Sequence, residues 1–175
     1  DAQARTYSLT LTQSCRPTPG QDHKQAFVIP LSLGLVGPDG QDLPLQLPDE
    51  ALPGATSRTF VISEPEETLT FINIDAKPVP SMLRGFSAPV VLEFDYSDAQ
   101  LLHLLAHDSD AFNRWEAGQR LAMRAALQAI ATGSSTQLLG TAHLDAMRII
   151  LRHDKLDAAF KELVLTLPSE TYIAE

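Results

Sequence analysis

The sequence predicts an all-β sandwich followed by an α-helical segment, with the division near Tyr96. Before this point, short apolar–polar alternations recur between prolines and glycines, a pattern typical of sandwich strands. After it, apolar residues recur with the 3.6-residue period of a helix. We therefore expect an immunoglobulin-like β-sandwich of about seven strands at residues 1–96. A solenoid-like α-helical segment, the start of an ARM/HEAT-like domain, is expected at residues 97–175.

Seven segments have the composition and alternation of short strands. They are residues 6–12, 29–35, 43–47, 58–63, 68–74, 82–86 and 90–94. Pro38 and Gly40 predict a tight turn between the second and third segments, which would form a hairpin. Pro44 and Pro48 lack backbone N–H groups, so the third segment is expected at a sheet edge. The cysteine pair of true immunoglobulin domains is absent from the sequence, and the likeness is one of architecture.

Four helices are expected after the division. Ser97 and Gln100 have the spacing of a capping box for a helix that ends near His107. Asp108, Ser109 and Asp110 offer an N-cap for a second helix that ends at Gly133, followed by a loop at residues 134–136. A third helix is expected at residues 141–153 and a fourth at 157–165. The expected buried residues of the second and third helices are Phe112, Trp115, Ala122, Ala126, Ile130, Leu144, Met147, Ile150 and Leu151.

Composition excludes several classes of function. The 175 residues have a net charge of −9, so binding to nucleic acid or to an anionic membrane is not expected. No apolar run approaches the roughly 20 residues that span a bilayer. The single cysteine, Cys15, indicates a reducing, cytoplasmic compartment and is expected to be an ordinary residue at a strand end. Because the sequence opens without Met, we expect it to be part of a longer polypeptide.

His103 and His107 are the strongest candidates for a metal site. Their i, i+4 spacing on a helix is that of the zinc motif H-E-x-x-H. Leu104 replaces the glutamate that would activate water, so the general base is missing. A third ligand could come only from Asp108, Asp110 or Glu116. Two polar surface or interface histidines are the simpler interpretation, and adventitious metal binding stays open.

The remaining candidates have simpler structural interpretations. Asp108 and Asp110 are expected to be helix caps, and Trp115 is expected in the core. No serine lies in a nucleophile-elbow motif, and no phosphate-binding or dinucleotide motif occurs. The sequence therefore predicts no catalytic, metal-binding or substrate-binding residue in this chain, and no cofactor.

Two stretches resemble the bacterial aminopeptidase N family, the alanyl aminopeptidase branch of the zinc gluzincin peptidases. They are SMLRGFSAPVVLEFDYSD at residues 81–98 and HDSDAFNRWEAGQRLA at residues 107–122, and the likeness extends to LPSE at residues 167–170. The resemblance covers nearly the whole chain. It is to the immunoglobulin-like domain that follows the catalytic domain and to the first helices of the C-terminal helical domain.

The resemblance implies a parent enzyme that removes N-terminal residues from peptides. In that family two His and a Glu hold zinc, a glutamate acts as general base, and a Gly-Ala-Met-Glu-Asn element binds the free amine. The resemblance places all of these before Asp1, so His103 and His107 do not correspond to the zinc motif. The implied partners are an upstream catalytic domain, a downstream helical domain that covers the active site, and the peptide substrates of the parent. The chain by itself is expected to be inactive.

Two other classes of function stay open. The chain could be a free-standing module that binds a protein partner, or a small metalloprotein that uses His103 and His107. An H-E-x-x-H helix upstream of Asp1 would select the peptidase, and metal analysis would test the metalloprotein.

Overall fold

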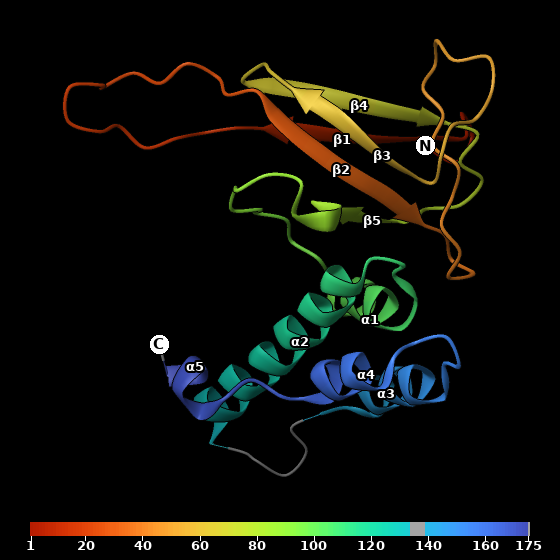
Figure 1. Cartoon of the computed structure of the whole chain (residues 1–175), viewed down its shortest axis with the longest axis vertical. Helices are drawn as coiled ribbons and strands as arrows, with labels where there is room; N and C mark the ends of the chain where they lie inside the picture. Colours follow the sequence, from red (N-terminus) through yellow and green to blue (C-terminus); the bar gives the residue numbers. More distant parts are fainter. Residues whose placement is uncertain (134–138, 175) are drawn as a thin grey trace. The chain divides into compact units, whose positions relative to one another are not determined.

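The computed structural model describes residues 1–133 and 139–174, which contain five β-strands, a 3₁₀ helix and five α-helices (Figure 1). The chain divides into two compact units, Asp1–Val91 and Leu92–Glu175. All of the strands lie in the first unit, and the described residues after Asp98 contain no strand.

The first unit contains two antiparallel sheets. β1 (Thr6–Thr12) pairs with β4 (Glu66–Ile72), and Leu9 lies opposite Leu69. The second sheet has the order β3-β2-β5 and consists of β3 (Ser57–Ile62), β2 (Ile29–Val36) and β5 (Val79–Met82). The loop between β1 and β2 extends well beyond the ends of the strands (Figure 1).

The inner faces of the sheets meet in an apolar core. Phe60 of β3 meets Phe71 of β4 edge to face, with ring centroids 5.8 Å apart. Alternate residues of the strands complete this core, as the pleat of a strand requires. They include Leu9, Leu31, Leu33, Leu35 and Ile62, all buried. On the outer face of β1, hydroxyl pairs such as Thr10–Thr68 (3.0 Å) join it to β4.

The third predicted strand, residues 43–47, does not form a ladder. Its backbone makes single hydrogen bonds to different neighbours, from Leu43 to Leu35 and from Ile72 to Gln46. Pro44 removes one donor, so regular pairing cannot develop. The predicted turn before it is confirmed: Gly40 has φ 80° and donates to the Gly37 carbonyl at 2.9 Å.

Two more strand predictions are wrong. The strand expected at residues 82–86 ends at Met82, because Leu83, Gly85 and Phe86 have positive φ angles and the chain forms η1 (Arg84–Phe86). Residues 90–94 pair with no strand in the described part of the chain. Val90 donates instead to the nearby Ala88 carbonyl at 3.0 Å. The immunoglobulin-like unit thus has five strands rather than seven.

The second unit contains the α-helices, with ends close to those expected. They are α1 (Asp98–His107), α2 (Ala111–Thr132), α3 (Thr141–Arg152), α4 (Ala158–Leu165) and α5 (Glu170–Ala174). The capping box of Ser97 and Gln100 forms at the start of α1. Asp110 and Asp157 cap α2 and α4, and Gly133 ends α2 with φ 64°. The sequence did not predict the short α5, and the predicted loop at residues 134–136 lies outside the described residues.

The buried faces of α2 and α3 differ in part from the prediction. Ile130 is 68% exposed, and Leu144 and Leu151 are also exposed. Ala122 and Ala126 are buried on α2 as expected, and the other buried residues of this helix are Arg114, Ala117, Gly118 and Leu121. Gly118 lies close to Leu105 of α1, where an added Cβ would be 3.2 Å from a Leu105 methyl. Close packing of α1 on α2 therefore favours the small side chains.

Candidate functional site

The two candidate histidines lie together on α1. Their ring centroids are 5.0 Å apart. Of the possible third ligands, Asp108 accepts from the Asp110 N–H at 2.9 Å, and Asp110 caps α2 by accepting from the Asn113 N–H. Within residues 1–133 and 139–174, no three His, Cys, Asp or Glu side chains are grouped so that they could hold a metal ion. No chemistry is assigned to a metal here, and the absence of a bound metal stays a prediction.

Trp115 is half-buried and stacks obliquely on Phe112, with ring centroids 5.4 Å apart. Neither ring belongs to the fully buried face of α2. The predicted core position of Trp115 is thus only partly correct. Cys15 is an exposed free thiol in the loop after β1.

A buried polar cluster centred on Arg84 is the most enclosed group of charges in the first unit. The guanidinium group donates two hydrogen bonds to the Asp42 carboxylate, at 3.0 and 2.9 Å, and its Nε donates to the Ser81 hydroxyl at 2.8 Å. Arg84 is 6% exposed and Ser81 is fully buried. The bidentate geometry makes this ion pair strong and directional. It joins the turn after β5 to the segment that follows the Gly37–Gly40 turn.

Sequence patterns do not reveal this cluster, because Asp42 and Arg84 are far apart along the chain. Ser81 and Arg84 do lie in the SMLRGFSAPV stretch that carries part of the family resemblance. The cluster has a structural role, since its groups are bonded to one another rather than directed at a ligand.

The second unit buries two basic side chains. Arg114 is 6% exposed, and burial lowers its pKa while the nearby Asp108 raises it. His143 of α3 is also 6% exposed, and burial lowers the pKa of its imidazole. Its Nε2 is buried without a hydrogen-bond partner in the described part of the chain. Neither residue was predicted to be buried, because charged residues at these helix positions look like surface residues.

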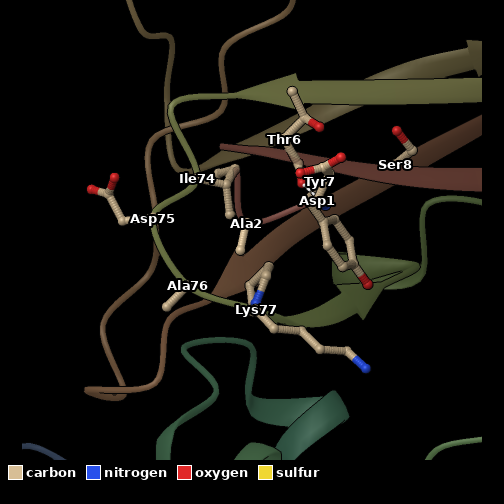
Figure 2. A pocket seen from close by; sticks show the side chains of 10 residues that line it. Asp1, Ala2, Thr6, Tyr7, Ser8, Ile74, Asp75, Ala76 and Lys77 are labelled. Atoms are coloured by element: carbon tan, nitrogen blue, oxygen red, sulfur yellow. Dashed lines mark hydrogen bonds between the residues drawn. The ribbon is translucent and has the colours of Figure 1, made fainter. Parts of the chain in front are cut away.

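A pocket of about 550 Å³ borders the beginning of β1, and Figure 2 shows the side chains that line it. We call it the edge pocket. It is lined by Asp1, Ala2, Thr6, Tyr7, Ser8, Ile74, Asp75, Ala76, Lys77 and Pro78. Tyr7 and Lys77 extend in the same direction, whereas Asp75 points away from them (Figure 2). Burial raises the pKa of the Tyr7 hydroxyl. This lining has no nucleophile paired with a base, so the edge pocket has no arrangement for covalent catalysis.

Comparison with known families identifies both units. Residues 1–95 match a domain of unknown function, DUF3458, described as having an Ig-like fold. The chain belongs to the DUF3458 family. Residues 98–175 match its companion, DUF3458_C, which is described as ARM repeats. An immunoglobulin-like sandwich followed by an ARM-type helical segment is therefore confirmed.

The predicted resemblance to aminopeptidase N is also confirmed. The chain is 35% identical over 175 residues to Aminopeptidase N of Escherichia coli strain K12, with 99% of this chain covered. It is 34% identical to Aminopeptidase N of Haemophilus influenzae in an alignment that covers the whole of this chain. It is 38% identical to Aminopeptidase N of Caulobacter vibrioides over 82% of this chain. The chain spans only 15 to 20% of the length of these relatives.

A solved structure supports the fold. The crystal structure of Legionella pneumophila aminopeptidase A in complex with aspartic acid superposes with a TM-score of 0.76 and 23% sequence identity. The superposition covers 99% of this chain and 18% of that one. Within the described residues, no helix is both long enough and apolar enough to cross a membrane.

Proposed function

We propose that this DUF3458 chain is a non-catalytic part of a zinc-dependent aminopeptidase of the aminopeptidase N type. The observation that supports this most strongly is the similarity to Aminopeptidase N along the whole chain, at 34 to 35% identity. Because the relatives are about five times as long as the shared region, most of such an enzyme lies outside this chain. Zinc, its ligands and the general base belong to that other part.

In this proposal the immunoglobulin-like domain, residues 1–96, connects the catalytic domain to the helical domain that begins at residue 97. The helical domain covers the active site and limits which peptides enter. The chain's partners are then its own catalytic and downstream helical domains, and the parent enzyme acts on peptides. A reducing, cytoplasmic compartment is part of the proposal, and the single exposed Cys15 supports it. No residue of the chain is assigned a catalytic or metal-binding role.

The polypeptide encoded by the complete reading frame tests this proposal. It should release arylamine from an aminoacyl arylamide, lose this activity on treatment with a chelator and recover it with zinc. It should also contain an H-E-x-x-H motif upstream of Asp1. A reading frame without that motif, whose product has no peptidase activity, would overturn the proposal in favour of a free-standing interaction module.

A further inference from the structure

The backbone of β1 has an unpaired edge. Thr6 lies opposite Ile72, yet its N–H donates to Asp1 at 3.0 Å and the Ile72 N–H donates to Gln46 at 2.9 Å. Thr6 and Ile72 are therefore a non-hydrogen-bonded pair, and such pairs alternate along an antiparallel ladder. It follows that the N–H and C=O groups of Ser8 and Thr10 also point away from β4. On that side β1 pairs with no strand in residues 1–133 and 139–174.

The sequence of β1 itself carries none of the usual protection against pairing. Exposed edge strands are normally short, or carry charges, prolines or bulges. β1 has seven residues, TYSLTLT, with no charge, proline or glycine. Among the β1 residues that point toward the core, Leu9 is buried, whereas Tyr7 and Leu11 are only half-buried. A further strand beside β1 would cover these two side chains.

The chain at Asp1 is already folded back along this edge. The Asp1 carbonyl accepts from the Thr6 N–H, and the Asp1 nitrogen donates to the Thr6 carbonyl at 2.7 Å. The loop between them is closed by the Asp1 carboxylate, which accepts from the backbone N–H groups of Gln3 and Ala4. Arg5 then has φ 52°. Four-residue loops of this kind connect the two strands of a β-hairpin, so Asp1 has the pairing of a strand residue antiparallel to β1.

The edge pocket provides space on the same side. Thr6, Tyr7 and Ser8 all line it. Consecutive strand residues point to opposite faces of a sheet, so a space bordered by all three lies at the strand's edge. The pocket therefore borders the edge of β1 at the end where Asp1 turns back, and residues 74–78 also line it.

We propose that the free edge of β1 is the docking site of an extended segment of the same polypeptide that leads into Asp1. The segment runs antiparallel to β1 and adds a third strand to the β1-β4 sheet. Continuing the Asp1–Thr6 pairing, the residues two and four positions before Asp1 exchange hydrogen bonds with Ser8 and Thr10. The residues one and five positions before Asp1 lie opposite Tyr7 and Leu11 and are apolar. The inference rests on the proposed function, because it requires the longer polypeptide of an aminopeptidase.

Residue-resolved amide hydrogen exchange on the full-length polypeptide and on the 175-residue chain tests this docking. In the full-length polypeptide, the Ser8 and Thr10 amides should exchange about tenfold more slowly than in the 175-residue chain, as expected for gaining one hydrogen bond of ordinary net strength. Leu9 and Leu11 are the internal controls, because their amides face β4 in both proteins and should change less. Equal exchange of Ser8 and Thr10 in the two proteins overturns the proposal, as does a mature polypeptide that begins at Asp1.

A pair of variants gives a second, independent measurement. Thr10→Pro and Thr10→Val both remove the hydroxyl bond to Thr68, but only Thr10→Pro removes the backbone N–H. The unfolding midpoint should fall further for Thr10→Pro than for Thr10→Val, and this excess should be larger in the full-length polypeptide. An excess of equal size in both proteins overturns the proposal.

Protein concentration separates the proposed occupant of the edge from a second copy of the chain. If protection of Ser8 and Thr10 in the full-length polypeptide rises with protein concentration, a second copy occupies the edge and the proposed occupant is wrong. Failure of the proposed peptidase function is distinguishable, because it is seen in the arylamide assay, whereas strand pairing is seen in the exchange of Ser8 and Thr10.

Discussion

Gly34 of β2 lies directly against the guanidinium group of Arg84. A Cβ atom added at Gly34 would fall 2.2 Å from the Arg84 Cζ, far inside any real contact distance. Arg84 cannot easily retreat, because it is held by two hydrogen bonds from its guanidinium group to Asp42 and one to Ser81. We therefore expect Gly34→Ala to lower the free energy of unfolding of the immunoglobulin-like unit by about 1–3 kcal/mol, the usual cost of overpacking. Urea unfolding of the two proteins measures this decrease in the free energy of unfolding.

A double-mutant cycle supplies the control. In an Arg84→Ala background the guanidinium group is gone, so Gly34→Ala should cost markedly less. The same cost in both backgrounds would contradict the role of Gly34 in leaving space for Arg84.

The two ion pairs Arg84–Asp42 and Arg5–Asp75 should differ in their contributions to stability. The side chains of Arg84 and Asp42 are only 6% and 15% exposed, whereas those of Arg5 and Asp75 are 53% and 75% exposed. Removing one partner of a buried pair leaves an uncompensated charge, so Arg84→Ala should cost about 3–5 kcal/mol. Arg5→Ala should cost less than about 1 kcal/mol. Equal losses in chemical denaturation of the two variants would contradict the structural role of the cluster.

Periodicity and capping chemistry are enough to predict most elements of this fold, because both depend on residues that are close together in the sequence. The Ser97–Gln100 capping box and the Gly133 helix end form as expected. The strand predictions fail where pairing depends on residues far away in the sequence. At residues 43–47 the alternation is correct, but the backbone bonds go to several different neighbours. The sequence does not predict the buried polar groups for the same reason, because Arg84 and Asp42 come together only in the folded chain.

The stability of the helical unit should depend on pH through His143. Burial lowers the pKa of this imidazole below its ordinary value of 6.5. Below pH 6.5 the unfolded chain therefore binds a proton that the folded chain resists, and the free energy of unfolding decreases as the pH falls further. Above pH 6.5 both states are neutral and the contribution is constant.

Urea unfolding followed by helical circular dichroism at pH 7.5 and at pH values below 6.5 measures this effect. His143→Gln should reduce the loss of stability on acidification, because glutamine does not titrate. His23→Gln is the matched control, since His23 is an exposed residue of the loop after β1, and it should leave the pH dependence unchanged. A pH dependence that is the same for all three proteins would refute the role of His143.

The 175-residue chain should hydrolyse no aminoacyl arylamide and should hold no stoichiometric zinc after dialysis. Leu104 stands between His103 and His107 where a zincin has its general base, and no third ligand joins the pair in the described part of the chain. Metal analysis and an arylamide assay measure the two properties. About one equivalent of zinc that is lost in a His103→Ala/His107→Ala variant would contradict this prediction.

Apolar side chains along α3 and α4 and near α5 should form a surface for association. Leu144, Leu163, Leu167 and Tyr172 are 38%, 52%, 43% and 61% exposed. ARM repeats bury such faces against the next repeat. In the 175-residue chain we therefore expect either concentration-dependent association through this surface or faster amide exchange in α4 than in α2.

Substitution of two leucines distinguishes a role of this surface in association from a role in the stability of the core. A Leu163→Ser/Leu167→Ser variant should remove the association seen by sedimentation while changing the free energy of unfolding by less than about 1 kcal/mol, because both side chains are already about half in water. Val61→Ser, at a 60% exposed position on β3, is the matched control and should leave association unchanged. A chain that stays monomeric at all concentrations, with α4 as well protected as α2, would show that these helices form a complete domain. The exposed leucines would then be ordinary surface residues, and no further repeat would be needed to cover them.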